Sequence, residues 1–245
     1  MRAVAVIPAR YQSVRFPGKP LAPIAGIPMI RRVWEGTRTA KSLRAVIVAT
    51  DDERIAETCR QFGAEVVMTR GDHPTGTDRP AEVAESLDDD VIVNVQGDEP
   101  LIEGFAIDAV VEALCRDSQV PMSTLVHPLE GAAIDDPNRV KVVLDRSGHA
   151  LYFSRSRIPA LRNPEKPPRY WQHVGLYAYR RDFLAEYMRL EPTDAERAEA
   201  LEQLRALENG YRIRCAVVEG WVSSPVDVPS DVARVEARLR ELGRP

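Results

Sequence analysis

The chain has 245 residues, enough for one large domain with a buried core, and its 44% hydrophobic and 29% charged residues are typical of a soluble globular protein. No apolar run approaches the ~20 residues that span a bilayer, and the run after Arg2 ends at Pro8, too short for a signal peptide, so we expect a cytoplasmic protein without membrane insertion. The net charge of −4 argues against nucleic acid as the main partner, because nucleic-acid-binding proteins usually carry a basic excess.

Apolar, β-branched runs alternate with amphipathic segments through the first half of the chain. The predicted strands are residues 3–7, 45–49, 65–68 and 91–95. The predicted helices are residues 28–39, 53–62, 77–87 and 103–116; the second is the best marked, with Thr50, Asp51 and Asp52 as N-cap candidates and Gly63 after its end. Strands that alternate with helices of this length predict an α/β fold built on a doubly wound, mostly parallel sheet.

The pattern changes around residue 140. Two predicted strands, 140–144 and 150–153, are separated by D-R-S-G, which is typical of a hairpin. The other predicted elements are strands at 172–179 and 212–218, helices at 181–189, 193–208 and 229–242, and an exposed loop at 161–169. We therefore expect one domain over residues 1–245, with a core layer of about 1–130 plus 211–245 and a smaller, inserted α+β subdomain at about 131–210.

A cation-rich loop follows the first predicted strand. Residues 7–21 read I-P-A-R-Y-Q-S-V-R-F-P-G-K-P-L and include Arg10, Arg15 and Lys19. Arginine forks, a lysine charge and backbone N–H groups suit a multiply charged anion. The loop is neither a G-x-x-x-x-G-K-[ST] motif, because Pro20 follows Gly18-Lys19, nor G-x-G-x-x-G. From these residues alone, an anion site and a solvated basic loop are equally supported.

Polar segments follow each of the four predicted strands of the first half. Because ligands of open α/β sheets bind outside the carboxyl ends of the strands, these segments predict the rim of a cleft. Asp98, which follows the strand at 91–95, is a typical Mg²⁺ ligand, although a turn or N-cap role is equally supported. Thr75, Gly76 and Thr77 could offer hydroxyl and backbone groups to a base or sugar, but an N-cap role is favoured for Thr77.

Polar residues of the second half give a weaker signal. His173 and Tyr177 lie four residues apart on a predicted strand and so share a face. Together with Arg155 they could recognise a polar substrate. The leucine stripe of L-E-Q-L-R-A-L predicts a helix whose flank, with Glu202 and Gln203, faces solvent.

Nine segments in one order then carry a resemblance to a known family. They are I-P-A-R-Y-x-S-x-R-x-P-G-K-P-L, V-A-T-D-D, M-T-R-x-D-H-x-x-G-T-D-R, N-V-Q-G-D-E-P, N-x-V-K-V-V, A-L-Y-F-S-R-x-x-I-P, H-x-G-x-Y-x-Y-R, L-E-Q-L-R-x-L-E-N-G and V-D-x-P-x-D. Over nearly its whole length the chain resembles the CMP-KDO synthetases, which are 3-deoxy-manno-octulosonate (KDO) cytidylyltransferases of lipopolysaccharide synthesis. The resemblance implies a nucleotidyltransferase-like fold and a homodimer.

The resemblance also implies roles for individual residues. The triphosphate of CTP would be bound by the loop residues Pro8, Ala9, Arg10, Ser13, Arg15 and Lys19. The cytidine would be held by Arg70, Thr75, Gly76 and Gln96. Mg²⁺ would be held by Asp98 and Asp227. The sugar acid, a 2-keto-3-deoxy acid, would be bound by Gln96, Arg155, His173, Tyr177, Glu202 and Gln203.

The implied reaction is attack of the anomeric 2-hydroxyl of KDO on the α-phosphorus of CTP, which releases pyrophosphate and forms CMP-KDO. Such a transfer needs positioning and charge stabilisation more than covalent chemistry, which suits catalytic roles for Arg15, Lys19 and Asp98. The chain reads S-S-P-V-D-V-P-S-D around Asp227, whereas the family pattern is closer to G-V-D-T-P-E-D. The surrounding turn therefore differs, while the aspartate is kept.

Three other functions are compatible with some of these residues. Activation of a close analogue such as 8-amino-KDO would leave the motifs unchanged. A CMP-sialate synthetase shares the style of the opening loop, but H-x-G-x-Y and L-E-Q-L-R point away from it. A non-catalytic nucleotide-binding protein is disfavoured because Lys19, Asp98 and Asp227 are all present.

Overall fold

The computed structural model describes residues 1–13, 15–73 and 75–244, so Val14 in the opening loop and Pro74 in the segment before the third helix lie outside the described residues. The described chain forms two compact units, one made of residues 1–108 and 223–244 and the other of residues 109–222. The second unit is thus larger than the expected insertion at about 131–210. It takes in the strands β7 (Met122–Leu129) and β11 (Ile213–Val217), which we had assigned to the core layer or had not predicted.

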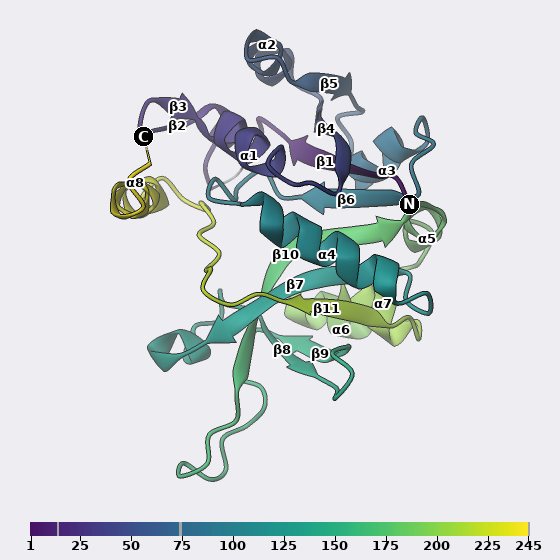
Figure 1. Ribbon diagram of the computed structural model, residues 1–245, viewed down its shortest axis with the longest axis vertical. Helices are drawn as coiled ribbons and strands as arrows, with labels where there is room; N and C mark the ends of the chain where they lie inside the picture. The colour runs from purple at the N-terminus through teal and green to yellow at the C-terminus, as the bar shows by residue number, and fades with distance from the viewer. Residues whose placement is uncertain (14, 74, 245) are drawn as a thin grey trace. The chain divides into compact units, whose positions relative to one another are not determined.

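Four parallel strands form the sheet of the first unit (Figure 1). They are β1 (Ala3–Ala9), β4 (Leu43–Thr50), β5 (Glu65–Met68) and β6 (Val91–Val95), in the spatial order β6-β1-β4-β5. Every residue of β6 is buried, as is typical of a strand covered on both faces. All four strands begin within two residues of their predicted positions, so the expected parallel α/β arrangement is confirmed for this unit.

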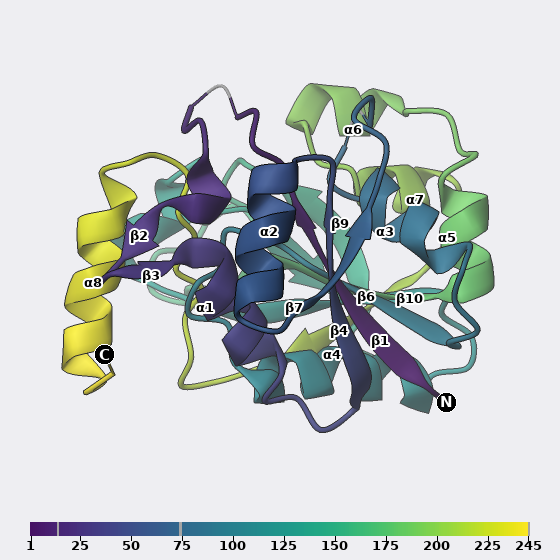
Figure 2. The ribbon, with the colours of Figure 1, turned by 90° about the horizontal axis from the view of Figure 1, so that it is seen from above.

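Several helices belong wholly or in part to this unit. They are α1 (Met29–Thr37), α2 (Glu53–Gln61), α3 (Asp78–Ala84), α4 (Gly104–Arg116), within which the division between the units falls, and α8 (Asp231–Glu241). In the first unit α2 packs on β4 and β5 (Figure 2), and Asp52 caps it by accepting from the Arg54 backbone N–H at 3.0 Å. A 3₁₀ turn, η1 (Lys19–Leu21), and a two-stranded hairpin, β2 (Pro23–Ile24) with β3 (Ile27–Pro28), were not predicted.

The second unit has a mixed sheet. Its strands are β7, β8 (Lys141–Leu144), β9 (Ala150–Ser154), β10 (Tyr170–Arg180) and β11. β10 is antiparallel to β7 and β8, β8 is antiparallel to β9, and β11 is parallel to β7. β7 was missed because His127 and Pro128 interrupt its apolar run, although both of its neighbours pair with it.

The predicted helix at 193–208 is wrong, since the structure has two short helices there. α6 (Asp194–Glu199) ends where Ala200 takes the left-handed conformation with φ 50° and ψ 52°, and α7 (Leu204–Glu208) begins four residues later. The two helices are joined by a nearly buried ion pair in which Arg205 Nη2 lies 2.5 Å from Glu196 Oε1. The unit also contains α5 (Arg181–Tyr187) and the 3₁₀ turn η2 (Gly131–Asp135).

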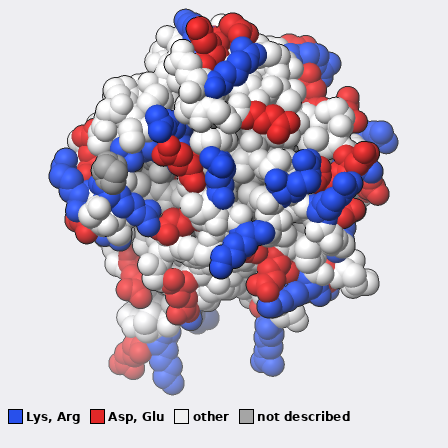
Figure 3. All heavy atoms as spheres, turned by 45° about the horizontal axis from the view of Figure 1, so that its top comes forward, with Lys and Arg blue, Asp and Glu red and all other residues white. Residues whose placement is uncertain are grey.

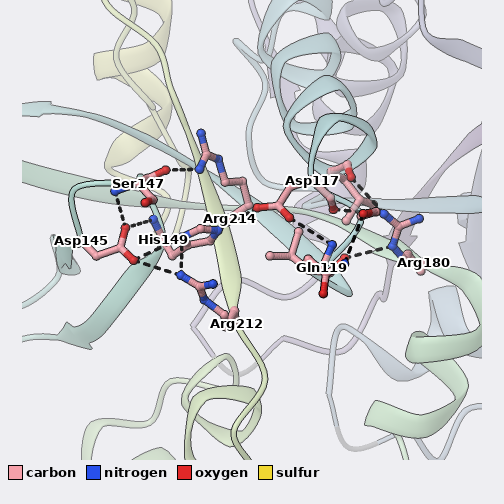
Figure 4. Close-up of polar contacts among 11 residues, drawn as sticks. Asp117, Gln119, Asp145, Ser147, His149, Arg180, Arg212 and Arg214 are labelled. Carbon is pink, nitrogen blue, oxygen red and sulfur yellow. Dashed lines mark hydrogen bonds and ion pairs between the residues drawn. The ribbon is translucent and has the colours of Figure 1, made fainter.

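A polar cluster holds the β8–β9 turn in the second unit (Figure 4). His149 Nε2 lies 2.8 Å from Asp117 Oδ2, in the turn after α4, and His149 Nδ1 lies 3.3 Å from Asp145 Oδ2. Arg212 donates to the same Asp145 oxygen at 3.2 Å. The cluster therefore joins three segments that are distant in the sequence.

In the part of the chain that the structure describes, no helix is long and apolar enough to cross a membrane. On the face drawn in Figure 3, basic and acidic side chains are interspersed, so that neither sign of charge dominates that face.

Candidate active site

A polar pocket of about 220 Å³ opens at the carboxyl ends of β1 and β6 in the first unit. The residues that line it are Pro8, Ala9, Arg10, Ser13, Arg15, Lys19, Pro20, His73, Thr75, Gly76, Arg79, Gln96, Gly97, Asp98 and Asp227. The strand ends thus meet as the parallel sheet requires. The pocket brings together the predicted triphosphate loop, most of the predicted cytidine residues and both predicted metal ligands.

Lys19 joins three segments at the floor of this pocket. Its Nζ lies 2.8 Å from Asp98 Oδ2 and donates to the Val226 carbonyl oxygen at 3.0 Å. Gly18, with φ 71°, directs the chain into η1, where Pro20 suits the first turn. This conformation explains why the loop reads G-K-P rather than the G-K-[ST] of a phosphate-binding loop.

Asp98 owes its position to the glycine before it. A β-carbon on Gly97 would lie 2.8 Å from the Pro8 carbonyl oxygen, closer than the backbone can accept. Only glycine therefore lets the ends of β1 and β6 approach, and the carboxylate that follows enters the space beside the loop. The Val226 N–H donates to the Asp98 carbonyl oxygen at 2.9 Å, which brings the segment before Asp227 to the same place.

Asp227 forms the second ion pair of the pocket. Arg15 Nη2 lies 2.9 Å from Asp227 Oδ1, with the two side chains 65% and 44% exposed. An ion pair this exposed is worth about 0–1 kcal/mol, so either group can exchange its partner for a phosphate or a metal ion at small cost. Asp231 Oδ2 closes the turn around Asp227, because it accepts from the backbone N–H groups of Asp227 and Val228 at 2.9 and 3.1 Å.

The predicted cytidine residues form a fixed turn on another wall. Asp78 Oδ2 accepts from both the backbone N–H and the hydroxyl of Thr75, each at 2.7 Å. Gly76 faces the side-chain amide of Gln96, since a β-carbon there would lie 3.5 Å from Gln96 Oε1. The Gln96 amide nitrogen donates to Asn94 Oδ1 at 3.3 Å. Thr75, Gly76 and Gln96 are thus adjacent, as expected for one subsite.

Arg70 differs from these residues. Within the described ranges it lies outside the pocket lining, and its Nε is 3.8 Å from Glu82 Oε2, with a side chain that is 71% exposed. Four residues to which we gave no role also line the pocket, Pro20, His73, Arg79 and Gly97. Arg79 is 4% exposed and pairs with Asp51 at 2.9 Å. The motif G-T-D-R includes Arg79, but the sequence does not distinguish a buried structural arginine from one that binds a ligand.

The second unit holds the remaining predicted substrate residues. His173 is 8% exposed, and burial lowers its pKa to about 3, so the imidazole is neutral near pH 7. Its Nε2 lies 3.0 Å from Thr124 Oγ1, and its ring lies 5.5 Å from the ring of Tyr177. His173 therefore offers hydrogen bonds rather than a positive charge to a polar substrate.

Gln203 is buried rather than on a solvated flank. It is 3% exposed, and its Oε1 accepts from the Tyr177 hydroxyl at 3.2 Å. Among the described residues its Nε2 has no hydrogen-bond partner. A buried amide donor without a partner costs about 1–3 kcal/mol, which indicates a ligand oxygen as its natural acceptor. The break at Ala200 turns Gln203 inward, and a continuous helix would not.

Arg155 is engaged by backbone carbonyl groups in the same unit. Its Nε donates to the Glu199 carbonyl oxygen at 2.7 Å, and its Nη2 to that of Ala200 at 3.3 Å. Its own backbone N–H donates to Glu199 Oε2 at 2.9 Å. Arg155 and Glu199 thus hold each other at the end of α6, where the helix breaks. Arg155 supports the segment that carries Glu202 and Gln203.

Comparison with known proteins agrees with this arrangement. A family model described as cytidylyltransferase matches residues 4–213. The chain belongs to the cytidylyltransferase family. It is 54% identical to a 3-deoxy-manno-octulosonate cytidylyltransferase of Syntrophotalea carbinolica, over 99% of this chain and 100% of the relative. It is 52% identical to the enzyme of the same name from Geobacter metallireducens, over 98% of each.

Solved structures extend the comparison of this cytidylyltransferase to its fold. A structure of CMP:2-keto-3-deoxy-manno-octonic acid synthetase complexed with CTP has a TM-score of 0.94 and 44% identity, covering 99% of this chain and 100% of the other. A 4-diphosphocytidyl-2C-methyl-D-erythritol synthase from Anaerococcus prevotii has a TM-score of 0.63 at 13% identity and shows the fold alone. The expected α/β nucleotidyltransferase-like fold is confirmed.

Proposed function

We propose that this cytidylyltransferase transfers CMP from CTP to the anomeric 2-hydroxyl of KDO, giving CMP-KDO and pyrophosphate for lipopolysaccharide synthesis. The observation that carries the proposal is the single pocket in which Lys19 pairs with Asp98 and Arg15 pairs with Asp227, at the carboxyl ends of parallel strands. Full-length identity of about half to enzymes named for this activity supports the choice of substrates.

The cations of the opening loop would bind the triphosphate. Arg10 and Arg15 are exposed and can turn their guanidinium groups to phosphate oxygens, which they hold in pairs. Lys19 is largely enclosed, with a side chain that is 17% exposed, and it holds a fixed place in the floor. As the bond from the α-phosphorus to the leaving oxygen breaks, negative charge grows on pyrophosphate, and Arg15 and Lys19 are placed to stabilise it.

The donor set also fits Mg²⁺. Asp98 and Asp227 line one pocket, and Mg²⁺ is usually held by one or two carboxylates together with phosphate oxygens and water. Both aspartates would hold the ion after exchanging their present lysine and arginine partners. When bound, Mg²⁺ would neutralise phosphate charge and lower the pKa of the attacking hydroxyl.

The second unit supplies groups suited to a hydroxyl-rich acid. Gln203 Nε2, which has no hydrogen-bond partner among the described residues, the Tyr177 hydroxyl and the neutral His173 imidazole can each bond a sugar oxygen. Arg155 holds the turn that presents Glu202 and Gln203. The proposal includes a homodimer in the cytoplasm, in keeping with the family resemblance and with CTP as a soluble substrate. Light scattering on purified protein tests the dimer.

A panel of pyrophosphate-release assays tests the function. CTP, UTP and ATP are each combined with Mg²⁺ and with KDO, 8-amino-KDO or sialic acid. We expect fast release only with CTP and KDO, and CMP-KDO in equal amount by mass spectrometry. Faster release with 8-amino-KDO would change the assigned sugar. No release with CTP and any of the three acids would overturn the enzymatic proposal.

A further inference from the structure

Glu99 is a buried carboxylate directly after Asp98, and it faces a different segment. It is 7% exposed, its Oε1 accepts from the Ser223 hydroxyl, and its Oε2 accepts from the Ser224 backbone N–H at 3.2 Å. Hydrogen bonds to a charged carboxylate are about twice as strong as those between neutral groups. The Glu99 side chain thus holds two consecutive residues that lie more than a hundred positions after it in the chain.

The segment that Glu99 fastens is held by contacts with other parts of the chain, and Arg234 Nη2 also donates to the Pro225 carbonyl oxygen at 2.7 Å. Residues 223–227 are in no helix or strand, and Pro225 has no N–H to donate. Next to the two contacts with Glu99, the Val226 N–H bonds the Asp98 carbonyl oxygen and Lys19 bonds the Val226 carbonyl oxygen. Together with the bond from the Asp227 backbone N–H to Asp231 Oδ2 at 2.9 Å, these contacts set the position of the Asp227 carboxylate.

Adjacent carboxylates therefore have separate tasks. Asp98 lines the pocket and pairs with Lys19, whereas Glu99 is not in the lining among the described residues. We propose that Glu99 is a positioning residue, which holds the 223–226 segment so that Asp227 stands at the pocket that Asp98 also lines. The inference rests on the proposed function, because it assigns Asp227 a role toward Mg²⁺ and the triphosphate.

The local sequence is suited to this role. The donors are the hydroxyl of Ser223 and the backbone of Ser224, in the part of the chain where S-S-P replaces the glycine-containing pattern of the family. Glu99 anchors the start of this segment from the turn that follows β6.

The test separates positioning from plain stability. Variants Glu99→Ala, Glu99→Gln and Ser223→Ala are compared with Asp227→Asn and with a control, Asp89→Asn, in which another buried carboxylate of this unit, away from the pocket, is changed. Calorimetry measures CTP affinity with and without Mg²⁺, and melting temperatures are recorded for all proteins. If Glu99→Ala does not fold, Glu99→Gln and Ser223→Ala carry the test.

Without Mg²⁺, we expect Glu99→Ala to bind CTP with an affinity within about twofold of the unaltered protein. The increase in CTP affinity that Mg²⁺ causes should be about tenfold smaller in Glu99→Ala, as in Asp227→Asn. The double variant Glu99→Ala/Asp227→Asn should lose no more of the Mg²⁺-dependent CTP affinity than Asp227→Asn alone, because the effects of residues that act through one another are not additive. Asp89→Asn should melt lower without any change in the Mg²⁺ effect.

Two results would overturn the inference while leaving the proposed function intact. One is an unchanged Mg²⁺ effect in Glu99→Ala together with a lower melting temperature. The other is a double variant whose loss is the product of the two single losses. If the unaltered protein binds CTP without any influence of Mg²⁺, the metal part of the proposed function fails and the inference fails with it.

Discussion

Lys19 Nζ and Asp98 Oδ2 lie 2.8 Å apart, although 79 residues separate them in the chain. The contact joins the loop after β1 to the end of β6 and leaves a cation and a carboxylate in the floor of one pocket. The lysine can bind a phosphate chain and the aspartate can bind a metal ion, so the pair places one group for each of these ligands in the same pocket.

The first prediction concerns Asp98. Asp98→Asn should lower turnover by at least about a hundredfold and weaken the dependence on Mg²⁺, because a neutral amide holds a divalent ion poorly. Pyrophosphate release measured against Mg²⁺ concentration checks this. Asp72→Asn, at a side chain that is 81% exposed, is the control and should behave like the unaltered protein. Near-normal rates in Asp98→Asn would remove Asp98 from the metal site.

The second prediction concerns Arg155. Arg155→Ala should raise KM for the sugar acid far more than KM for CTP, because the turn that presents Gln203 loses its bonds to the Glu199 and Ala200 carbonyl oxygens. Arg155→Lys should recover little, since one ammonium cannot reproduce the guanidinium fork. Arg157→Ala, at a neighbouring arginine bonded to Tyr170, is the control. An equal rise in both KM values would contradict the assignment.

The third prediction concerns the charge of His173. Because burial lowers its pKa from 6.5 to about 3, the side chain stays neutral throughout the working range and KM for the sugar acid should show no inflection near pH 6.5 from this residue. Protonation is penalised only in the folded state, so the penalty on stability starts below pH 6.5 and grows as pH falls toward 3. An inflection near 6.5 that disappears in His173→Gln would disprove the neutral role.

The fourth prediction concerns the helix break. Ala200 adopts a left-handed conformation that costs a residue with a side chain about 1–2 kcal/mol, and more when the side chain is β-branched. Ala200→Val should therefore lower the free energy of unfolding by about 1–2 kcal/mol beyond the loss in Ala198→Val, a control within α6, whereas Ala200→Gly should stay within about 1 kcal/mol of the unaltered protein. Urea unfolding measures all three, and equal losses in both valine variants would contradict the strained turn.

The fifth prediction concerns acid stability. The His149 backbone N–H donates to the Asp145 carboxylate, and this bond is the main reason that the pKa of Asp145 falls from 3.8 to about 2. The charged Asp145 stabilises the fold fully at pH values above its pKa in the unfolded chain. This stabilisation is lost as the pH falls from about 4 to 2, so melting temperatures should drop over that range of pH. Asp145→Asn should flatten the drop. If the melting temperature of Asp145→Asn fell by the same amount over this range of pH, the loss of stability would belong to other carboxylates.

Much of the first unit could be read from local patterns. Strands such as β6 are continuous apolar runs, α2 has an N-cap and a glycine stop, and polar residues at consecutive strand ends must meet in a parallel sheet. The predicted loop and both predicted metal ligands accordingly line one pocket. Arg70 lies outside the pocket lining among the described residues, with its Nε 3.8 Å from Glu82 Oε2, and no local pattern reports such a contact, so its role toward the cytidine stays a prediction.

The sequence by itself determined the alternation of strands and helices, the cationic loop and the order of motifs, because each of these depends on residues that are close in the chain. Only the tertiary structure decided that Gln203 is buried behind a break at Ala200, that β7 pairs with β10 and β11, and that Glu99 holds Ser223 beside the pocket. These features depend on contacts between distant residues, and such contacts leave no periodic signal in the sequence.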